Sequence, residues 1–288
     1  MNFSQYDQNA LDLAKNFKYP EKSIWKSIRE VVNTPFDLAG NLIDSIPGIG
    51  EALNKSTNGL VTLFNEAAAY TVRKNAILEE FRNDGNQFIN SLDDIFKLNL
   101  ENVDKTVGHL ATKYNALAAA EGATVAGAPY LAGPAMPAAA LAAIVADVPV
   151  FTGLCLRAIG EYATYYGFDI DRQEERAYAL YILGLTSTST SARNALIANL
   201  TKLSTQMAKK VAWRELDNSI FVNIVKQIAQ SFGIRVTKGK LAMVVPLAGI
   251  GINTGFNTYM MNKVCDASYI LYRERFLSIK YSNKNLIS

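Results

Sequence analysis

Apolar residues recur every three to four positions along most of the chain, which is the spacing of amphipathic helices. The first such stretch runs from Ser4 to Phe17, and Ser4 is a suitable N-cap for it. Further helices are expected over residues 51–82, 87–121, 138–165, 171–185, 192–215, 218–232 and 263–280. No run of alternating apolar and polar residues indicates a strand. The pattern predicts an all-α fold, a single multi-helix bundle.

Two stretches differ from this pattern because they are rich in small residues and almost free of charge. The first spans residues 116–166 and is uncharged from Gly122 to Ala146. Prolines end helices, so Pro129, Pro134 and Pro137 predict a turn between a helix ending near Glu121 and one starting near Ala138. The second stretch is uncharged over residues 241–262 and carries Pro246. Each stretch is expected to form a helical hairpin.

Small residues allow two helices to approach closely. We therefore expect the hairpins to form the core, with the helix near Ala138 packed on the helix near Gly249. On this interpretation, leucine at Ala142 or Gly251 would overpack the contact. The positions expected at the hairpin contacts are Gly127, Gly133, Gly249, Gly251, Asn253 and Gly255.

Composition limits the class of protein. The chain has 288 residues and 49% apolar content, enough to bury one large core. We expect an N-terminal helix over residues 1–19, one helical domain over 20–280 and a polar tail over 281–288. The net charge of +3 lacks the basic excess of a nucleic-acid binder. Cys155 and Cys265 lie in apolar helical surroundings, and no signal peptide is recognisable, so a cytoplasmic location is expected.

Asp147 and Arg157 are the first charges after the alanine-rich stretch. An unpaired buried carboxylate is costly, so Asp147 is expected to have a partner, sought among Arg235, Lys238 and Lys240. Arg157 is expected to pair with Glu161 or Asp266. The alternative is that Asp147, two residues before Pro149, caps a helix boundary. Together with Glu121, these residues form the candidate functional charge network.

Catalytic and cofactor motifs are missing from the sequence. His109 is the only histidine, and no nucleophile motif surrounds a serine. Residues 233–240 do not fit a phosphate-binding loop, and Gly249 to Gly255 lack the strand that a dinucleotide site needs. The acidic pairs Asp93-Asp94 and Glu174-Glu175 are expected to face solvent. We therefore expect no cofactor, metal or identifiable small-molecule ligand.

Neither hairpin is long enough in sequence to cross a bilayer. A spanning helix needs about 20 apolar residues. Residues 138–146 and 247–262 are the longest candidate stretches, and both fall short. A buried core is favoured, and re-entrant or conditional insertion stays open.

The two hairpins carry a family resemblance. Its marks are Glu121-Gly122, Gly127, Gly133-Pro134, Asp147, Arg157, Tyr166-Gly167-Phe168-Asp169, Pro246, Gly249, Gly251, Asn253, Gly255, Asn257, Ala267 and Tyr269. In order and spacing they resemble the bacterial EcsC protein family, over residues 20 to 277. The resemblance implies an all-helical bacterial protein without an established catalytic activity, whose namesake accompanies an ABC transporter linked to secretion.

Three functions follow as hypotheses. The first is a non-catalytic helical protein at the cytoplasmic face of the inner membrane, peripheral or conditionally inserted, whose partner is a membrane surface or a membrane protein such as an ABC transporter. The second is a membrane-inserting toxin or effector. The third is a hydrolase with an unrecognised site, for which only Glu121 and Asp147 argue.

Overall fold

The computed structural model describes residues 3–20, 46–127, 136–187, 190–208, 218–244 and 255–284. Within these ranges the regular secondary structure is helical throughout, so the prediction of an all-α bundle is confirmed. The elements are α1 (Gln5–Lys18), α5 (Ile49–Asn65), η1 (Ala67–Tyr70), α6 (Lys74–Asn83), α7 (Leu92–Ile95), α8 (Leu100–Val107), α9 (Leu110–Gly127), α10 (Met136–Tyr165), α11 (Gln173–Ser187), α12 (Thr190–Ala208), α13 (Asn218–Val244) and α14 (Phe256–Lys284).

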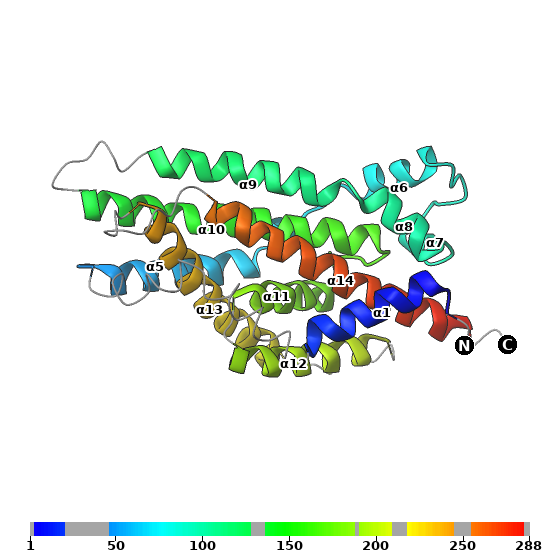
Figure 1. The fold of residues 1–288 in the computed structure, drawn as a ribbon. Coiled ribbons are helices and arrows are strands. Elements are labelled where there is room, and N and C mark those ends of the chain that lie inside the picture. The colour runs from blue at the N-terminus through cyan, green and yellow to red at the C-terminus, as the bar shows by residue number, and fades with distance from the viewer. Residues whose placement is uncertain are drawn as a thin grey trace.

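The long helices α9, α10 and α14 lie lengthwise against one another, as Figure 1 shows. Helix α10 is central, because it also contacts α5, α11 and α13. Helix α11 is enclosed by α10, α12, α13 and α14, and its residues from Ala177 to Ser187 are all buried. Helix α1 packs along the C-terminal half of α14, near both chain ends (Figure 1). One continuous apolar core joins these helices.

The single helix expected over residues 51–82 is wrong, because the chain turns after α5. Glu66 adopts an extended conformation, and the short η1 precedes α6. The turn buries the Tyr70 ring, whose hydroxyl donates to the Phe64 carbonyl at 3.2 Å. Gly160 of α10 makes room for this segment, since a Cβ there would lie 3.0 Å from Val72 Cγ2. Tertiary packing here overrides the helical periodicity.

The region expected to be helical over residues 87–121 is divided into α7, α8 and α9. A capping box starts α7: the Ser91 side chain and the Asp94 side chain each satisfy a backbone amide of the other. The expected cap at Ser4 and the expected helix end near residue 165 are confirmed. Ser4 caps α1, and α10 ends at Tyr165, two residues before Gly167, whose φ is 86°. The Phe168 amide donates to the Ala163 carbonyl at 2.9 Å, a bond that closes helices ending in a left-handed residue.

Helix α10 runs without a break through Pro149, so the helix boundary considered at Asp147 is wrong. Pro149 is accommodated against α5, where a Cβ on Gly59 would lie 3.2 Å from its Cγ. Because α10 is continuous, residues 141–165 are long and apolar enough to cross a bilayer, whereas the sequence alone indicated that the apolar stretch at residues 138–146 is too short. Half of the most apolar window is buried inside the bundle, as in the core helix of many soluble proteins, so this segment is weak support for a membrane span.

Only part of the packing expected at the hairpins is found in the structure. Helix α10 does pack against α14, but Ala142 is exposed, so the overpacking expected at this position is wrong. Gly255 is also not at a tight contact: a Cβ there would meet no atom within 4 Å, and its φ of 150° explains the glycine instead. Gly127 is the last residue of α9. Gly133, Gly249, Gly251 and Asn253 lie outside the described residues.

Candidate functional site: a buried carboxylate and lysine cluster

Four polar side chains from four helices meet inside the bundle. They are Glu121 of α9, Asp147 of α10, Lys240 of α13 and Asn257 of α14, and we call them the buried cluster. Lys240 has no exposed surface, and Asp147 and Asn257 are buried. The cluster therefore links the helices on either side of the two small-residue stretches, α9 and α10 beside the first and α13 and α14 beside the second.

Lys240 is the centre of the cluster. Its Nζ donates to Asp147 Oδ2 and lies 3.3 Å from Glu121 Oε1. The ammonium also lies 4.7 Å from the centroid of the Phe151 ring, a favourable contact for a cation. The second oxygen of Glu121 accepts from Asn257 Nδ2. A fully buried lysine is tolerated only when it is paired in this way.

Two glycines let the helices approach at the cluster. A Cβ on Gly122 would lie 3.0 Å from Asn257 Nδ2, so the glycine leaves room for the amide that reaches Glu121. A Cβ on Gly239 would lie 2.0 Å from Phe256 Cε2, which is too close for any side chain. The small residues beside Glu121 and Lys240 thus position the polar groups as well as the helices.

Two carboxyl groups share one ammonium, and this imbalance changes the acidity of Glu121. Burial, together with the neighbouring Asp147 carboxylate, raises the pKa of Glu121 to about 8, although Lys240 opposes the rise. Protonated Glu121 can donate a hydrogen bond to Asp147. Burial also raises the pKa of the nearby Cys155 thiol well above its usual range, so this thiol stays neutral. Near neutral pH the carboxyl group of Glu121 is therefore mostly protonated.

The remaining candidates of the charge network lie elsewhere. Arg157 is exposed on α10, and within the described residues it forms no ion pair with Glu161 or Asp266, so that expectation is wrong. Glu161 instead pairs with Lys113 at 2.6 Å. Arg235 and Lys238 are half-buried on α13. Of the three cations considered for Asp147, Lys240 makes the ion pair found in the described part of the chain.

A second buried ion pair was missed from the sequence. Glu174 and Glu175 were expected to face solvent, but both are buried. Glu175 accepts two hydrogen bonds from Arg275, at 2.7 and 2.9 Å, and the guanidinium lies 4.0 Å and 4.1 Å from the ring centroids of Phe168 and Tyr178. Nothing in the local spacing reveals this, because the partners are 100 positions apart.

Asp104 forms a third buried polar group between α8 and α14. It accepts hydrogen bonds from the hydroxyls of Tyr6 and Tyr166 at 2.8 and 2.6 Å, and its Oδ2 lies 2.9 Å from Arg273 Nε. Tyr6 belongs to α1, so Asp104 also fastens the N-terminal helix to the bundle. Both oxygens of the Asp104 carboxylate are therefore engaged within the protein, which indicates a structural role.

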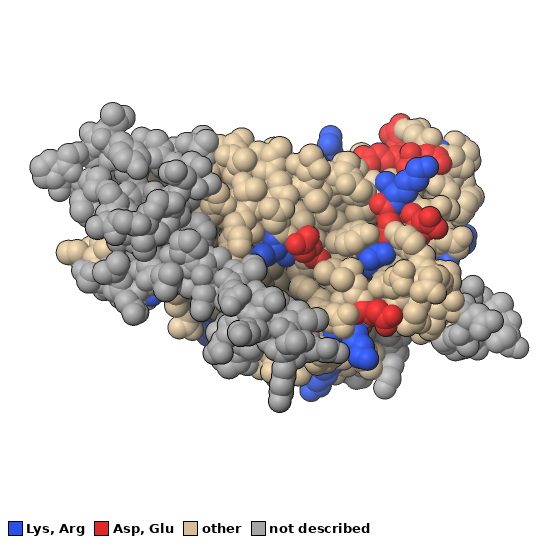
Figure 2. All heavy atoms as spheres, in the orientation of Figure 1, with Lys and Arg blue, Asp and Glu red and all other residues tan. Residues whose placement is uncertain are grey.

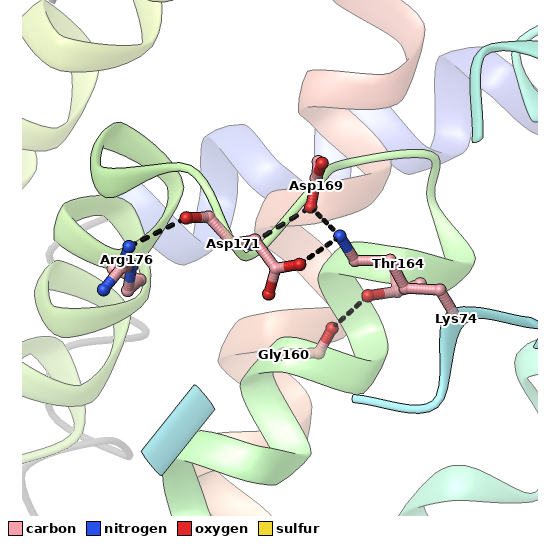
Figure 3. Close-up of polar contacts among 6 residues, drawn as sticks. All are labelled: Lys74, Gly160, Thr164, Asp169, Asp171 and Arg176. Carbon is pink, nitrogen blue, oxygen red and sulfur yellow. Dashed lines mark hydrogen bonds and ion pairs between the residues drawn. The ribbon is translucent and has the colours of Figure 1, made fainter. Parts of the chain in front are cut away.

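The segment after α10 carries a more exposed cluster, drawn in Figure 3. The Lys74 ammonium points between the carboxylates of Asp169 and Asp171 and pairs with both. Asp169 also accepts from the Asp171 amide at 3.1 Å. Partial burial would raise the pKa of Asp169, but these hydrogen bonds outweigh it and hold the pKa below its ordinary value. The cluster ties the start of α6 to the connection between α10 and α11.

The surface near the buried cluster is apolar. On α9 between Tyr114 and Gly122, and on α10 between Leu141 and Leu156, the exposed residues are Ala116, Leu117, Ala119, Ala120, Ala142, Ala146 and Val150. We call these seven residues the apolar surface. Figure 2 shows most charged side chains of this view toward the end with α6, α7, α8 and the termini, while the visible surface along α9 is mostly uncharged. Exposed faces of soluble helices are ordinarily polar.

Comparison with known proteins places the chain in a family. The family model described as the EcsC protein family matches residues 46–277. The chain belongs to the EcsC protein family. Among its relatives is the uncharacterized protein YdbA of Bacillus subtilis (strain 168), 23% identical over 278 residues that cover 92% of both chains. Protein EcsC of the same strain is 24% identical over 170 residues, covering 58% of this chain and 66% of its own. No solved structure is significantly similar to the chain.

The family match encompasses the buried cluster and α5 to most of α14. It leaves α1 outside, although in this EcsC-family protein α1 is bonded to the bundle through Asp104, Tyr281 and Glu274.

Proposed function

We propose that this EcsC-family protein is a non-catalytic helical protein that binds a membrane surface through the apolar surface of α9 and α10. The observation that carries the proposal is that all seven exposed residues there are alanine, leucine or valine. Apolar surfaces of monomeric proteins frequently mark interaction sites. Alanine-rich helix faces offer neither the deep pocket nor the aromatic anchors typical of protein interfaces.

Charge placement supports a lipid partner. Beyond the buried cluster, the first charged residue is a cation on each of three neighbouring helices: Lys113 on α9, Arg157 on α10 and Lys263 on α14. Cations at the edge of an apolar surface suit the level of lipid headgroups. Lys113 is already paired with Glu161, so Arg157 is the exposed cation most open to a phosphate group.

Enclosure of the carboxylates argues against the hydrolase hypothesis. The side chains of Glu121 and Asp147 are only 15% and 10% exposed, and both are engaged with Lys240. A general acid and base must reach a substrate. Support of an ABC transporter or of protein secretion, which the family resemblance implies, is compatible with binding at a membrane surface.

Flotation of the purified protein with phosphatidylcholine vesicles tests this proposal. The variant pair Leu117→Lys and Val150→Lys changes residues that are 44% and 61% exposed. The control pair, Leu13→Lys and Phe88→Lys, changes residues of similar exposure, 43% and 48%, on α1 and before α7. Each double variant adds two lysines, so the two variants differ only in where the added charge lies.

The proposal predicts that wild type and control float with the vesicles and that the Leu117→Lys/Val150→Lys variant loses at least about tenfold in binding, since charge is costly at this depth. No flotation of wild type contradicts the proposal. Equal loss in both variants also contradicts it, because the effect then follows net charge. Dimerisation that only the Leu117→Lys/Val150→Lys variant abolishes, without vesicle binding, would identify a second copy as the partner.

A further inference from the structure

The buried cluster adjoins the apolar surface along α9 and α10. Glu121 follows the exposed Ala120, and Asp147 follows the exposed Ala146. Val150, which is 61% exposed, is one turn from Asp147 on α10. A lipid surface in contact with these residues therefore replaces water within about one side-chain length of the cluster.

The net charge of the cluster depends on one proton. With Glu121 and Asp147 both ionised, the cluster carries two negative charges against the single Lys240 ammonium. With Glu121 protonated, the charges balance. Three further contacts of the cluster within the described residues are neutral: the amide of Asn257, the ring of Phe151 and the Cys155 thiol.

Other ionisable groups on the packed elements are exposed, lie on other faces of their helices, or have contacts of their own. On α5, which packs against α10 and α13, Glu51 and Lys55 are exposed and pair with each other at 2.7 Å. On α13, Lys238 and Arg235 lie about 160° and 140° around the helix from Lys240. On α14, Cys265 is buried and neutral, and Lys263 contacts the Tyr259 ring. Lys113 and Glu161, on α9 and α10, pair with each other.

We propose that membrane binding takes up a proton into the buried cluster at Glu121, so that docking on a lipid surface and protonation of this carboxyl reinforce each other. The inference rests on the proposed function. A net charge is penalised more than a balanced cluster when water nearby is replaced by lipid. Because two ligands that favour the same state favour each other equally, vesicle binding promotes proton binding and protonation promotes vesicle binding.

The direction of the pH effect follows from the acidity of Glu121, whose pKa is raised to about 8 by burial and by Asp147. Vesicle affinity is constant well below this pH and falls as the pH rises through it. One coupled proton sets the upper limit at about tenfold per pH unit.

The test measures vesicle affinity of the full chain across this range with phosphatidylcholine vesicles, whose headgroups keep their charge. Wild type should bind more weakly above about pH 8. Glu121→Gln, which keeps the shape of a protonated carboxyl, should bind at every pH as wild type does at low pH. Glu101→Gln, at an exposed position of α8, is the matched control and should keep the wild-type dependence.

A measurement without variants makes the test independent of their folding. Wild type mixed with vesicles in weakly buffered solution near pH 8 should take up protons, and a pH indicator should report a rise. Binding without proton uptake, or an equal pH dependence in Glu121→Gln, overturns this inference and leaves the proposed function standing. No binding at any pH overturns both.

Discussion

The Lys240 ammonium nitrogen lies 3.3 Å from Oε1 of Glu121, although the two residues are 119 positions apart. Asp147 contacts the same ammonium from a third helix. The side chains that balance charge in this EcsC-family protein therefore also join α9, α10 and α13.

Removal of the Lys240 ammonium is expected to lower the stability of the fold more than neutralisation of Asp147. Lys240→Met leaves the buried Asp147 carboxylate without its cation and should lower the free energy of unfolding by about 3–5 kcal/mol. Asp147→Asn keeps a hydrogen-bonding group and should cost about 1–3 kcal/mol. Urea unfolding of both variants and of the double variant measures their coupling. A double variant as unstable as the sum of the two would show that the residues act independently.

Stability should depend on pH through Glu121. Its pKa of about 8 in the fold exceeds the ordinary 4.5, so the folded chain binds more protons than the unfolded chain between these values. The stabilising contribution is complete below the ordinary pKa and is lost as the pH rises through the folded pKa, by up to about 1.4 kcal/mol per unit. Urea unfolding from about pH 5 to about pH 9 should show this fall in wild type and a flatter profile in Glu121→Gln. Parallel profiles would mean that another group is responsible.

Two glycines provide a matched test of packing at the cluster. Gly239→Ala puts a Cβ against the Phe256 ring and should destabilise the protein by about 1–3 kcal/mol. Gly153→Ala, within α10, meets no atom within 4 Å and should be neutral or stabilising by about 0.5–1 kcal/mol, because alanine favours helix. Thermal unfolding of both variants measures the difference. Equal melting temperatures would show that α13 and α14 are farther apart than described.

The adjacent acids Glu174 and Glu175 should respond differently to the same substitution. Glu175→Gln leaves the buried Arg275 without its carboxylate and should cost about 3–5 kcal/mol. Glu174→Gln removes a pair with the exposed Arg172 and should cost less than about 1 kcal/mol. Denaturant unfolding of the two variants, which have the same net charge, makes the comparison. Similar losses would argue against the buried geometry of Arg275.

Local signals in the sequence were enough for the helical class, the Ser4 cap and the end of a helix near residue 165. They limited the partner of Asp147 to Arg235, Lys238 or Lys240, because a buried carboxylate needs a cation, but only the structure identifies Lys240. Long-range packing decided the rest. The break after α5 follows from burial of Tyr70, and the enclosure of Glu175 follows from an arginine on a distant helix. The passage of α10 through Pro149 depends on the space left by Gly59 of α5.

The central claim, that the apolar surface of α9 and α10 faces lipid, is tested most directly by a fluorophore sensitive to its surroundings. The probe is attached to a cysteine placed in turn at Leu117, Val150 and Phe88, in a chain whose native Cys155 and Cys265 are buried. On addition of phosphatidylcholine vesicles, the account predicts a blue-shifted, brighter emission at Leu117 and Val150 and no change at Phe88. A shift at Phe88 alone, or at none of the three, would contradict it.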